Sequence, residues 1–138
     1  MARAIEECKK RGAKRALALP LSAPFHSSLL RPAGERLAGY LEKVNLAPPA
    51  ISLVNNVDVK VETDPGAIKA ALVRQAYSPV RWVEVIAKMM KSGATHVVEC
   101  GPGKVLAGLT RRISPDTKSF ALADRAALEE ALSCLKAG

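Results

Sequence analysis

The residue best suited to chemistry is His26, one of only two histidines in the 138-residue chain, within residues 22–28 (SAPFHSS). A neutral imidazole takes up a proton near pH 7 and returns it, as general acid–base catalysis requires. An apolar run at 15–21 predicts a buried strand before His26, and apolar positions at helical spacing over 28–44 predict a helix after it. Open α/β sheets place ligands at such strand-to-helix junctions. His26 is therefore a candidate catalytic residue, although a histidine that only caps or packs the loop would fit the same position.

The elements that must position this histidine alternate between strand and helix. Asp64 and Pro65 form an N-cap and N1 pair that opens one helix, and Gly12 is expected to end the helix at 1–11 as a C′ residue. Val57, Val59 and Val61 alternate with charged residues, as in a half-exposed strand. Short links between β and α segments indicate an α/β fold, a parallel sheet with helices on its faces. The expected helices cover 1–11, 28–44, 64–75, 82–90, 104–113 and 126–136, and the expected strands cover 15–21, 51–54, 57–61, 95–100 and 119–122.

Composition argues against two classes of partner. The net charge of +8 is compatible with nucleic-acid binding. However, aromatic residues make up only 4% of the chain and provide no stacking platform for bases, so we expect no nucleic-acid partner. No apolar run approaches the ~20 residues that span a bilayer, so we also expect no membrane association.

The cysteines predict a reduced, cytoplasmic protein. Cys8, Cys100 and Cys134 are odd in number and far apart, which favours free thiols over a disulfide framework. We expect each to pack as a small buried hydrophobe. No group of residues has metal-ligand spacing, so no metal site is expected. The second histidine, His96, lies in an apolar strand and is expected to be structural.

A glycine-rich turn, Gly101-Pro102-Gly103, separates an expected strand from an expected helix. Such an arrangement can cradle a phosphate at the helix N-terminus. It also fits a simple tight turn, because Pro102 lacks an N–H donor and the spacing matches no phosphate-binding loop.

Four blocks of sequence carry a resemblance when they are taken in order. They are 19–33 (LPLSAPFHSSLLRPA), 54–60 (VNNVDVK), 72–75 (LVRQ) with 78–82 (SPVRW), and 99–106 (ECGPGKVL). Together they resemble bacterial malonyl-CoA:acyl carrier protein transacylases, and they cover nearly the whole chain. The acyltransferase domains of polyketide and fatty acid synthases share the histidine block. The other blocks are more similar to the free-standing enzyme.

The resemblance also indicates what the chain does not contain. The family attacks its substrate with a serine in a G-H-S-x-G turn, and no Gly-x-Ser-x-Gly occurs in these 138 residues. The chain therefore resembles the C-terminal half of the enzyme. By this resemblance, residues 1–24 are the last helix and strand of a small ferredoxin-like insert domain. Residues 25–138 are the C-terminal part of an α/β-hydrolase-like domain, with helices on both faces of its parallel sheet.

The resemblance implies malonyl transfer from malonyl-CoA to the phosphopantetheine thiol of acyl carrier protein, in fatty acid biosynthesis. The reaction is a ping-pong exchange through an acyl-serine. It implies His26 as general base and acid, and the backbone carbonyl of Gln75 as the group that orients its ring. Phe25 matches an aromatic residue of the malonyl pocket, although ordinary core packing would also explain it. No cofactor is implied, because coenzyme A and the carrier-bound pantetheine are substrates.

The sequence also fits other functions. The chain would also fit a non-enzymatic basic module that binds an acidic protein such as acyl carrier protein, or an acyltransferase domain of a polyketide synthase. We expect the chain alone to be inactive, because a base without its nucleophile has no acyl-serine route. We also expect it to self-associate, because an unpaired sheet edge is a template for association.

Overall fold

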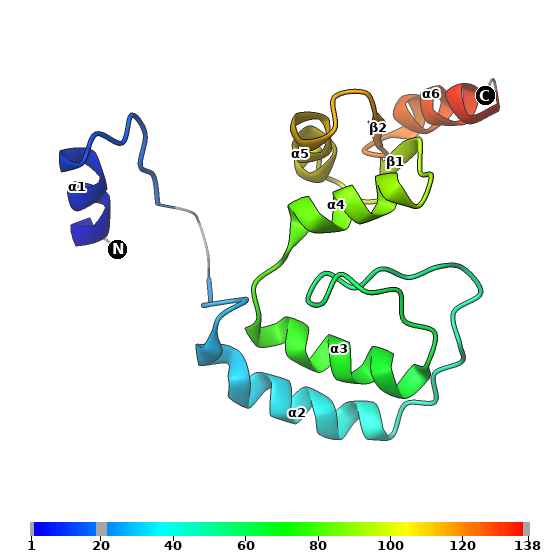
Figure 1. Ribbon diagram of the computed structural model, residues 1–138, viewed down its shortest axis with the longest axis horizontal. Coiled ribbons are helices and arrows are strands. Elements are labelled where there is room, and N and C mark those ends of the chain that lie inside the picture. The colour runs from blue at the N-terminus through cyan, green and yellow to red at the C-terminus, as the bar shows by residue number, and fades with distance from the viewer. Residues whose placement is uncertain (1, 19–21, 137–138) are drawn as a thin grey trace.

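The computed structural model describes residues 2–18 and 22–136. In the described residues it contains six α-helices, one 3₁₀ turn and a two-stranded sheet (Figure 1). The elements are α1 (Ala2–Lys10), η1 (Ser28–Leu30), α2 (Arg31–Glu42), α3 (Pro65–Tyr77), α4 (Trp82–Lys91), β1 (His96–Glu99), α5 (Val105–Ile113), β2 (Lys118–Ala121) and α6 (Arg125–Lys136).

The helix predictions are confirmed, and two of the predicted helix ends are reproduced in detail. Asp64 caps α3, with its Oδ2 accepting a hydrogen bond from the N–H of Ala67 at 2.6 Å, and Pro65 occupies the first turn. Gly12 has φ +88° just beyond α1, the left-handed conformation that ends helices. At the start of η1, Ser27 occupies the N-cap position, but its side chain does not cap the turn. Its hydroxyl donates instead to the carbonyl of Pro24 at 2.7 Å.

The helices α2 and α3 pack side by side and form one unit of the molecule (Figure 1). Their close approach depends on Gly34, which is buried against the C-terminal turn of α3. A Cβ at Gly34 would lie 2.7 Å from the ring of Tyr77 and 3.2 Å from the carbonyl oxygen of Val73. The guanidinium group of Arg31 lies over the same Tyr77 ring, with its central carbon 4.8 Å from the ring centroid.

The C-terminal elements form a second unit around a parallel strand pair, as the sequence predicts for 95–122. The register pairs His96 with Lys118 and Glu99 with Ala121. Both strands pack against α5, while α6 packs on β2 and α4 packs on α5. The strand β1 is half-buried rather than buried, because within the described residues it has one neighbouring strand.

The core is small for a chain of this length. Among the described residues, its largest buried apolar side chain is Ile86 of α4, and Val85 of the same helix is also buried. The other buried apolar residues in the part of the chain that the structure describes are alanines, namely Ala71, Ala107 and Ala131. Many large apolar side chains stay exposed in consequence, among them Leu29, Ile51 and Val105.

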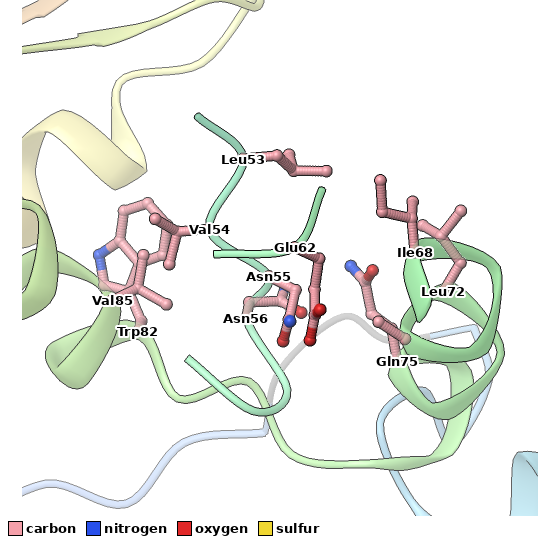
Figure 2. A pocket seen from close by; sticks show the side chains of 11 residues that line it. Leu53, Val54, Asn55, Asn56, Glu62, Ile68, Leu72, Gln75, Trp82 and Val85 are labelled. Carbon is pink, nitrogen blue, oxygen red and sulfur yellow. The ribbon is translucent and has the colours of Figure 1, made fainter. Parts of the chain in front are cut away.

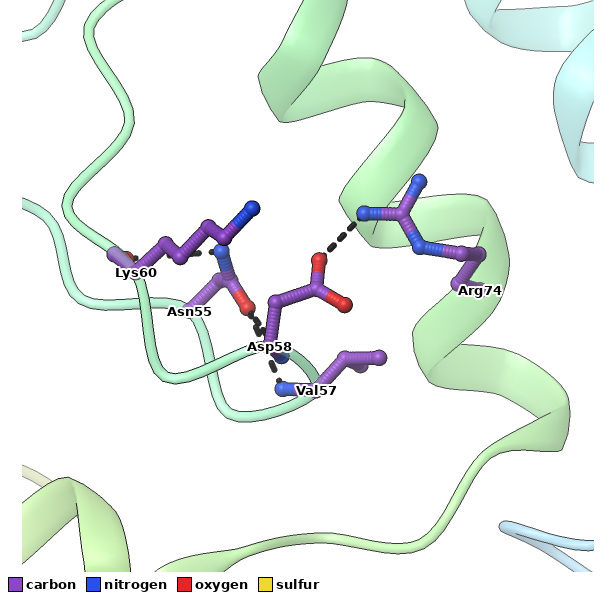
Figure 3. Close-up of polar contacts among 5 residues, drawn as sticks. All are labelled: Asn55, Val57, Asp58, Lys60 and Arg74. Carbon is purple, nitrogen blue, oxygen red and sulfur yellow. Dashed lines mark hydrogen bonds and ion pairs between the residues drawn. The ribbon is translucent and has the colours of Figure 1, made fainter.

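Three strand predictions are wrong. Residues 15–18 are not a strand, and Leu17 is 64% exposed, since no described strand pairs with this segment; the remainder of the prediction, 19–21, lies outside the described residues. The segments 51–54 and 57–61 form a loop that is closed by a single antiparallel bridge between Val54 and Val61. The cause lies in Asn55, whose Oδ1 accepts hydrogen bonds from two backbone N–H groups and turns the chain (Figure 3).

The cysteine prediction is also wrong for two of the three residues. Cys8 and Cys100 are exposed and Cys134 is half-buried, and all three are free thiols. Cys8 is exposed because α1 buries none of its residues and stands apart from the other helices in Figure 1. No helix among the described residues is long and apolar enough to cross a membrane.

The close packing around Gly34 predicts that a larger residue at this position lowers stability. We expect Gly34→Ala to lower the free energy of unfolding by about 1–2 kcal/mol, because overpacking costs ~1–3 kcal/mol and the helix preference of alanine returns at most ~1. Gly39→Ala, in the same helix, is the matched control, since a Cβ there meets no atom within 4 Å. That change should raise stability by about 0.5–1 kcal/mol. Urea unfolding followed by circular dichroism measures both, and equal effects would contradict the close packing.

Candidate functional site

His26 lies in a turn that precedes η1, and its backbone is held in an unusual conformation. Its φ is +58°, in the left-handed region that non-glycine residues seldom adopt. Such a conformation persists where the surrounding structure holds it, and it is found often at functional sites. The described residues before the histidine, 15–18 and 22–25, form no strand, contrary to the sequence prediction.

The conformation of His26 is held by the end of α3. The last four carbonyls of a helix have no partner within the helix, and His26 engages two of them. Its backbone N–H donates to the carbonyl of Ala76 at 3.3 Å, and its ring Nδ1 lies 3.0 Å from the carbonyl oxygen of Gln75. The structure therefore brings together His26 and Gln75, which are 49 positions apart in the sequence.

This contact determines which ring nitrogen can do chemistry. A carbonyl oxygen only accepts hydrogen bonds, so the contact requires a proton on Nδ1 of His26. In the neutral ring the other nitrogen, Nε2, then carries the free lone pair. His26 is arranged to accept a proton at Nε2 while Nδ1 stays bonded to Gln75.

Phe25 and His26 stand at one end of an open groove between α2 and α3. The groove has a volume of about 470 Å³ and is mostly apolar. Phe25 is 56% exposed and forms part of its wall, so it does not pack in the core. All three residues that the sequence singles out, Phe25, His26 and Gln75, contribute to this groove. Its lining consists of Phe25, His26, Leu30, Ala33, Leu37, Leu41, Leu72, Gln75 and Ala76.

A second cavity, of about 270 Å³, shares Leu72 and Gln75 with the lining of this groove (Figure 2). The side chain of Gln75 points into it from α3, toward Asn55 and Glu62 on the loop before that helix. Two polar atoms in its lining, Asn56 Oδ1 and Trp82 Nε1, are buried and have no hydrogen-bond partner in the described part of the chain. The sequence did not predict this polar lining. The one signal for it was the VNNVDVK block at 54–60, which contains Asn55 and Asn56.

The glycine-rich turn at 101–103 does not present an open helix N-terminus. The carboxylate of Glu99 reaches across the turn, and its Oε2 accepts a hydrogen bond from the N–H of Ala107 in the first turn of α5 at 2.9 Å. A carboxylate at this position complements the positive end of the helix dipole. Of the two interpretations, the tight turn fits, because a protein side chain already occupies the place of an anion.

His96 is engaged at both ring nitrogens. Nδ1 lies 2.8 Å from the hydroxyl of Thr95, and Nε2 lies 3.8 Å from the sulfur of Cys134. Its ring also stacks on Phe120, with the centroids 6.4 Å apart. Within the described residues, no group of three or more histidine, cysteine or acidic side chains is arranged to hold a metal ion.

An exposed ion pair lies at the link between α3 and α4. The hydrogen bond from Arg81 lowers the pKa of the Glu84 carboxyl below its usual value, and the same bond raises the pKa of Arg81. The carboxylate of Asp58 also contributes to the raised pKa of Arg81. The backbone N–H of Arg81 donates to the carbonyl of Asn56 at 3.0 Å, which ties this link to the loop at 54–61.

No family model matches the chain, but the chain is similar to curated proteins that share one description. The chain is 50% identical over 131 residues to a malonyl CoA-acyl carrier protein transacylase of Salmonella typhimurium. This match covers 95% of this chain and 42% of the relative. It is 51% identical over 133 residues to a protein of the same description from Haemophilus influenzae, and this match covers 94% of this chain and 43% of the relative.

Solved structures show the same relation. An acyl-carrier-protein S-malonyltransferase from Burkholderia pseudomallei is 57% identical, with a TM-score of 0.89, over 96% of this chain and 43% of its own. A malonyl-transacylase solved in complex with a type II polyketide synthase acyl carrier protein is 46% identical, with a TM-score of 0.89, over 96% and 43%. The chain thus spans about two fifths of the length of the curated relatives it matches.

Proposed function

We propose that this chain, a homologue of part of the malonyl-CoA:acyl carrier protein transacylases, supplies the general base for malonyl transfer from malonyl-CoA to the phosphopantetheine thiol of acyl carrier protein. The observation that carries the proposal is the 3.0 Å contact between Nδ1 of His26 and the carbonyl of Gln75, which directs Nε2 to proton transfer. The homology supplies the reaction. The reduced thiols are in keeping with a cytoplasmic location.

In the proposed first half-reaction, His26 takes a proton at Nε2 from the serine of the family's G-x-S-x-G turn. That serine is not among these 138 residues. The serine oxygen attacks the thioester carbonyl of malonyl-CoA, and the C–S bond breaks. The imidazolium returns its proton to the departing sulfur, which leaves free coenzyme A and a malonyl-serine ester.

In the second half-reaction, His26 takes the proton of the pantetheine thiol of the carrier protein. The thiolate attacks the ester, the C–O bond breaks, and Nε2 returns the proton to the serine oxygen. The carbonyl of Gln75 stays bonded to Nδ1 throughout and keeps the ring in one orientation. This is the task that a carboxylate performs in many serine hydrolases.

We also propose roles for Phe25 and for the fold. The ring of Phe25 stands next to His26 on the groove wall, where it would leave little room for an α-methyl branch on the acyl group and so favour malonyl over methylmalonyl. The β1–β2 pair would be part of a larger hydrolase-like parallel sheet. Residues 1–24 would belong to the ferredoxin-like insert.

The proposed partner is supported by charge and by one relative. The net charge of +8 is complementary to a strongly acidic carrier protein. One structural relative was solved with its acyl carrier protein. The non-enzymatic alternative, a basic module that only binds the carrier, makes no use of the His26–Gln75 contact. An acyltransferase domain of a polyketide synthase would use the same contact on a different carrier.

The test is a chimaera that joins the unmatched part of the Burkholderia pseudomallei relative to this chain. We expect it to transfer malonyl groups from malonyl-CoA to acyl carrier protein, and to lose this activity when His26 is replaced. A folded chimaera that binds the carrier protein but does not transfer malonyl groups would favour the binding module. Activity with polyketide carriers alone would favour the polyketide alternative.

The exposed apolar surface predicts self-association of the chain by itself. Leu29, Ile51 and Val105 are 73%, 82% and 70% exposed, and such surface together with an unpaired strand edge favours association. Sedimentation over a concentration series should show a weight-average mass that rises with concentration. The chimaera is the control and should stay monomeric, and a monomeric chain at all concentrations would contradict the prediction.

A further inference from the structure

The loop at 54–61 is a turn closed by hydrogen bonds around Asn55 (Figure 3). Asn55 Oδ1 accepts hydrogen bonds from the N–H groups of Val57 and Asp58, at 3.2 and 2.7 Å. Its backbone N–H donates to the carbonyl of Lys60 at 3.0 Å, and the bridge between Val54 and Val61 closes the loop. These bonds determine where the loop points its side chains.

The turn presents Asp58 to α3. The Asp58 carboxylate forms an ion pair with the guanidinium of Arg74, and the side chains of Asp58 and Arg74 are only 29% and 39% exposed (Figure 3). Partial burial reduces screening by solvent, so this pair constrains its partners more than the more exposed pairs of α1 and α6 do. Arg74 directly precedes Gln75, whose carbonyl contacts His26.

The same loop holds the chain beyond α3. The N–H of Arg81 donates to the carbonyl of Asn56 at 3.0 Å, so the segment 74–81 is attached to the loop near both of its ends. Between these attachments lie the carbonyls of Gln75 and Ala76, the two that receive hydrogen bonds from His26. Val59 has φ +57°, a costly conformation for a β-branched residue, and the closed loop maintains it.

We infer that the Asp58–Arg74 ion pair is a positioning device for His26, acting through the carbonyl of Gln75. It holds the last turn of α3 at the place where this carbonyl meets Nδ1, and so keeps the free lone pair on Nε2. Neither residue touches the reacting atoms. The inference deepens the proposed function and rests on it for its catalytic meaning, but the coupling itself can be measured without any substrate.

The experiment is ¹⁵N NMR of the histidine side chains in the 138-residue chain, which reports the ratio of the Nδ1–H to the Nε2–H tautomer at pH values where the ring is neutral. In Asp58→Asn and in Arg74→Gln, this ratio at His26 should fall about three- to tenfold, the change expected when one hydrogen bond of ordinary strength is weakened. The charge-swapped double variant Asp58→Arg with Arg74→Asp should restore much of the ratio.

Two controls separate positioning from general loss of structure. Arg125→Gln breaks an ion pair of the same type with Glu129 in α6 and should leave the His26 ratio unchanged. The resonances of His96, which is held by Thr95 and Cys134, should stay constant in every variant. Should Asp58→Asn fail to fold, Arg74→Lys keeps the charge without the planar fork, and should give a ratio between those of the wild type and Arg74→Gln.

An unchanged His26 ratio in Asp58→Asn and Arg74→Gln would overturn the inference. So would a fall that the double variant does not reverse at all. The outcome is independent of the proposed function, because transfer by the chimaera tests that function separately. If the His26 tautomer ratio responds to the ion pair but the chimaera transfers no malonyl groups, only the proposed enzymatic function is contradicted. If the chimaera transfers malonyl groups but the ratio does not respond, only the positioning role of the ion pair is contradicted.

Discussion

Replacing His26 with alanine should lower the kcat of the chimaera for malonyl transfer by about 10²–10⁴-fold, the usual contribution of a positioned general base. Alanine removes Nε2, so the serine and pantetheine thiol lose their proton acceptor and the leaving sulfur loses its proton donor. The measurement is transfer of labelled malonyl groups to acyl carrier protein at saturating malonyl-CoA. Binding of the carrier protein should change little.

Gln75→Ala is the matched control for His26→Ala. Its side chain points into the cavity beside Asn55 and Glu62, whereas the contact to His26 uses its backbone carbonyl, which alanine keeps (Figure 2). We therefore expect this variant to retain most of the activity. Equal losses at both positions would show that the glutamine side chain acts in the reaction, or that packing around it holds the site. Activity of His26→Ala equal to that of the unchanged chimaera would refute the proposed role of His26.

The second large effect is the difference between the chain alone and the chimaera in forming a covalent intermediate. Incubated with malonyl-CoA, the chimaera should accumulate up to one malonyl-serine ester per molecule, since the acyl-serine has no acceptor without the carrier protein. The chain alone should form none. It contains nine serines, and none has the Gly-x-Ser-x-Gly framing that exposes a nucleophile. Mass spectrometry of the intact proteins measures both.

The exposed thiols require a control in this measurement. Cys8 and Cys100 are exposed and could exchange with the thioester of malonyl-CoA. Neutral hydroxylamine cleaves such a protein thioester faster than an oxygen ester, so it distinguishes cysteine from serine adducts. A stoichiometric oxygen ester on any serine of the chain alone would mean that these residues carry their own nucleophile, contrary to the proposal.

Local sequence determined the helices and their ends. Asp64 and Pro65 predict the start of α3, and Gly12 predicts the end of α1, because capping and left-handed backbone depend on the residue itself and its close neighbours. The parallel pairing of the strands near 96 and 119 also follows from the short strand–helix–strand order. His26 was singled out by its residue type, and its assignment as the base came from resemblance.

Only the tertiary structure decided how these parts meet. The contact between His26 and the Gln75 carbonyl joins residues far apart in the chain, and the left-handed backbone of His26 depends on the end of a helix that no local pattern reveals. The strand predictions failed because the described part of the fold supplies no neighbouring strand for these segments. Alternating valines at 57–61 satisfy the pattern of a strand, but a strand forms only against a neighbour, and Asn55 instead ties its own backbone into a turn. Propensity is a property of a segment, whereas strand pairing, burial and the orientation of the His26 ring depend on the partners that the fold supplies.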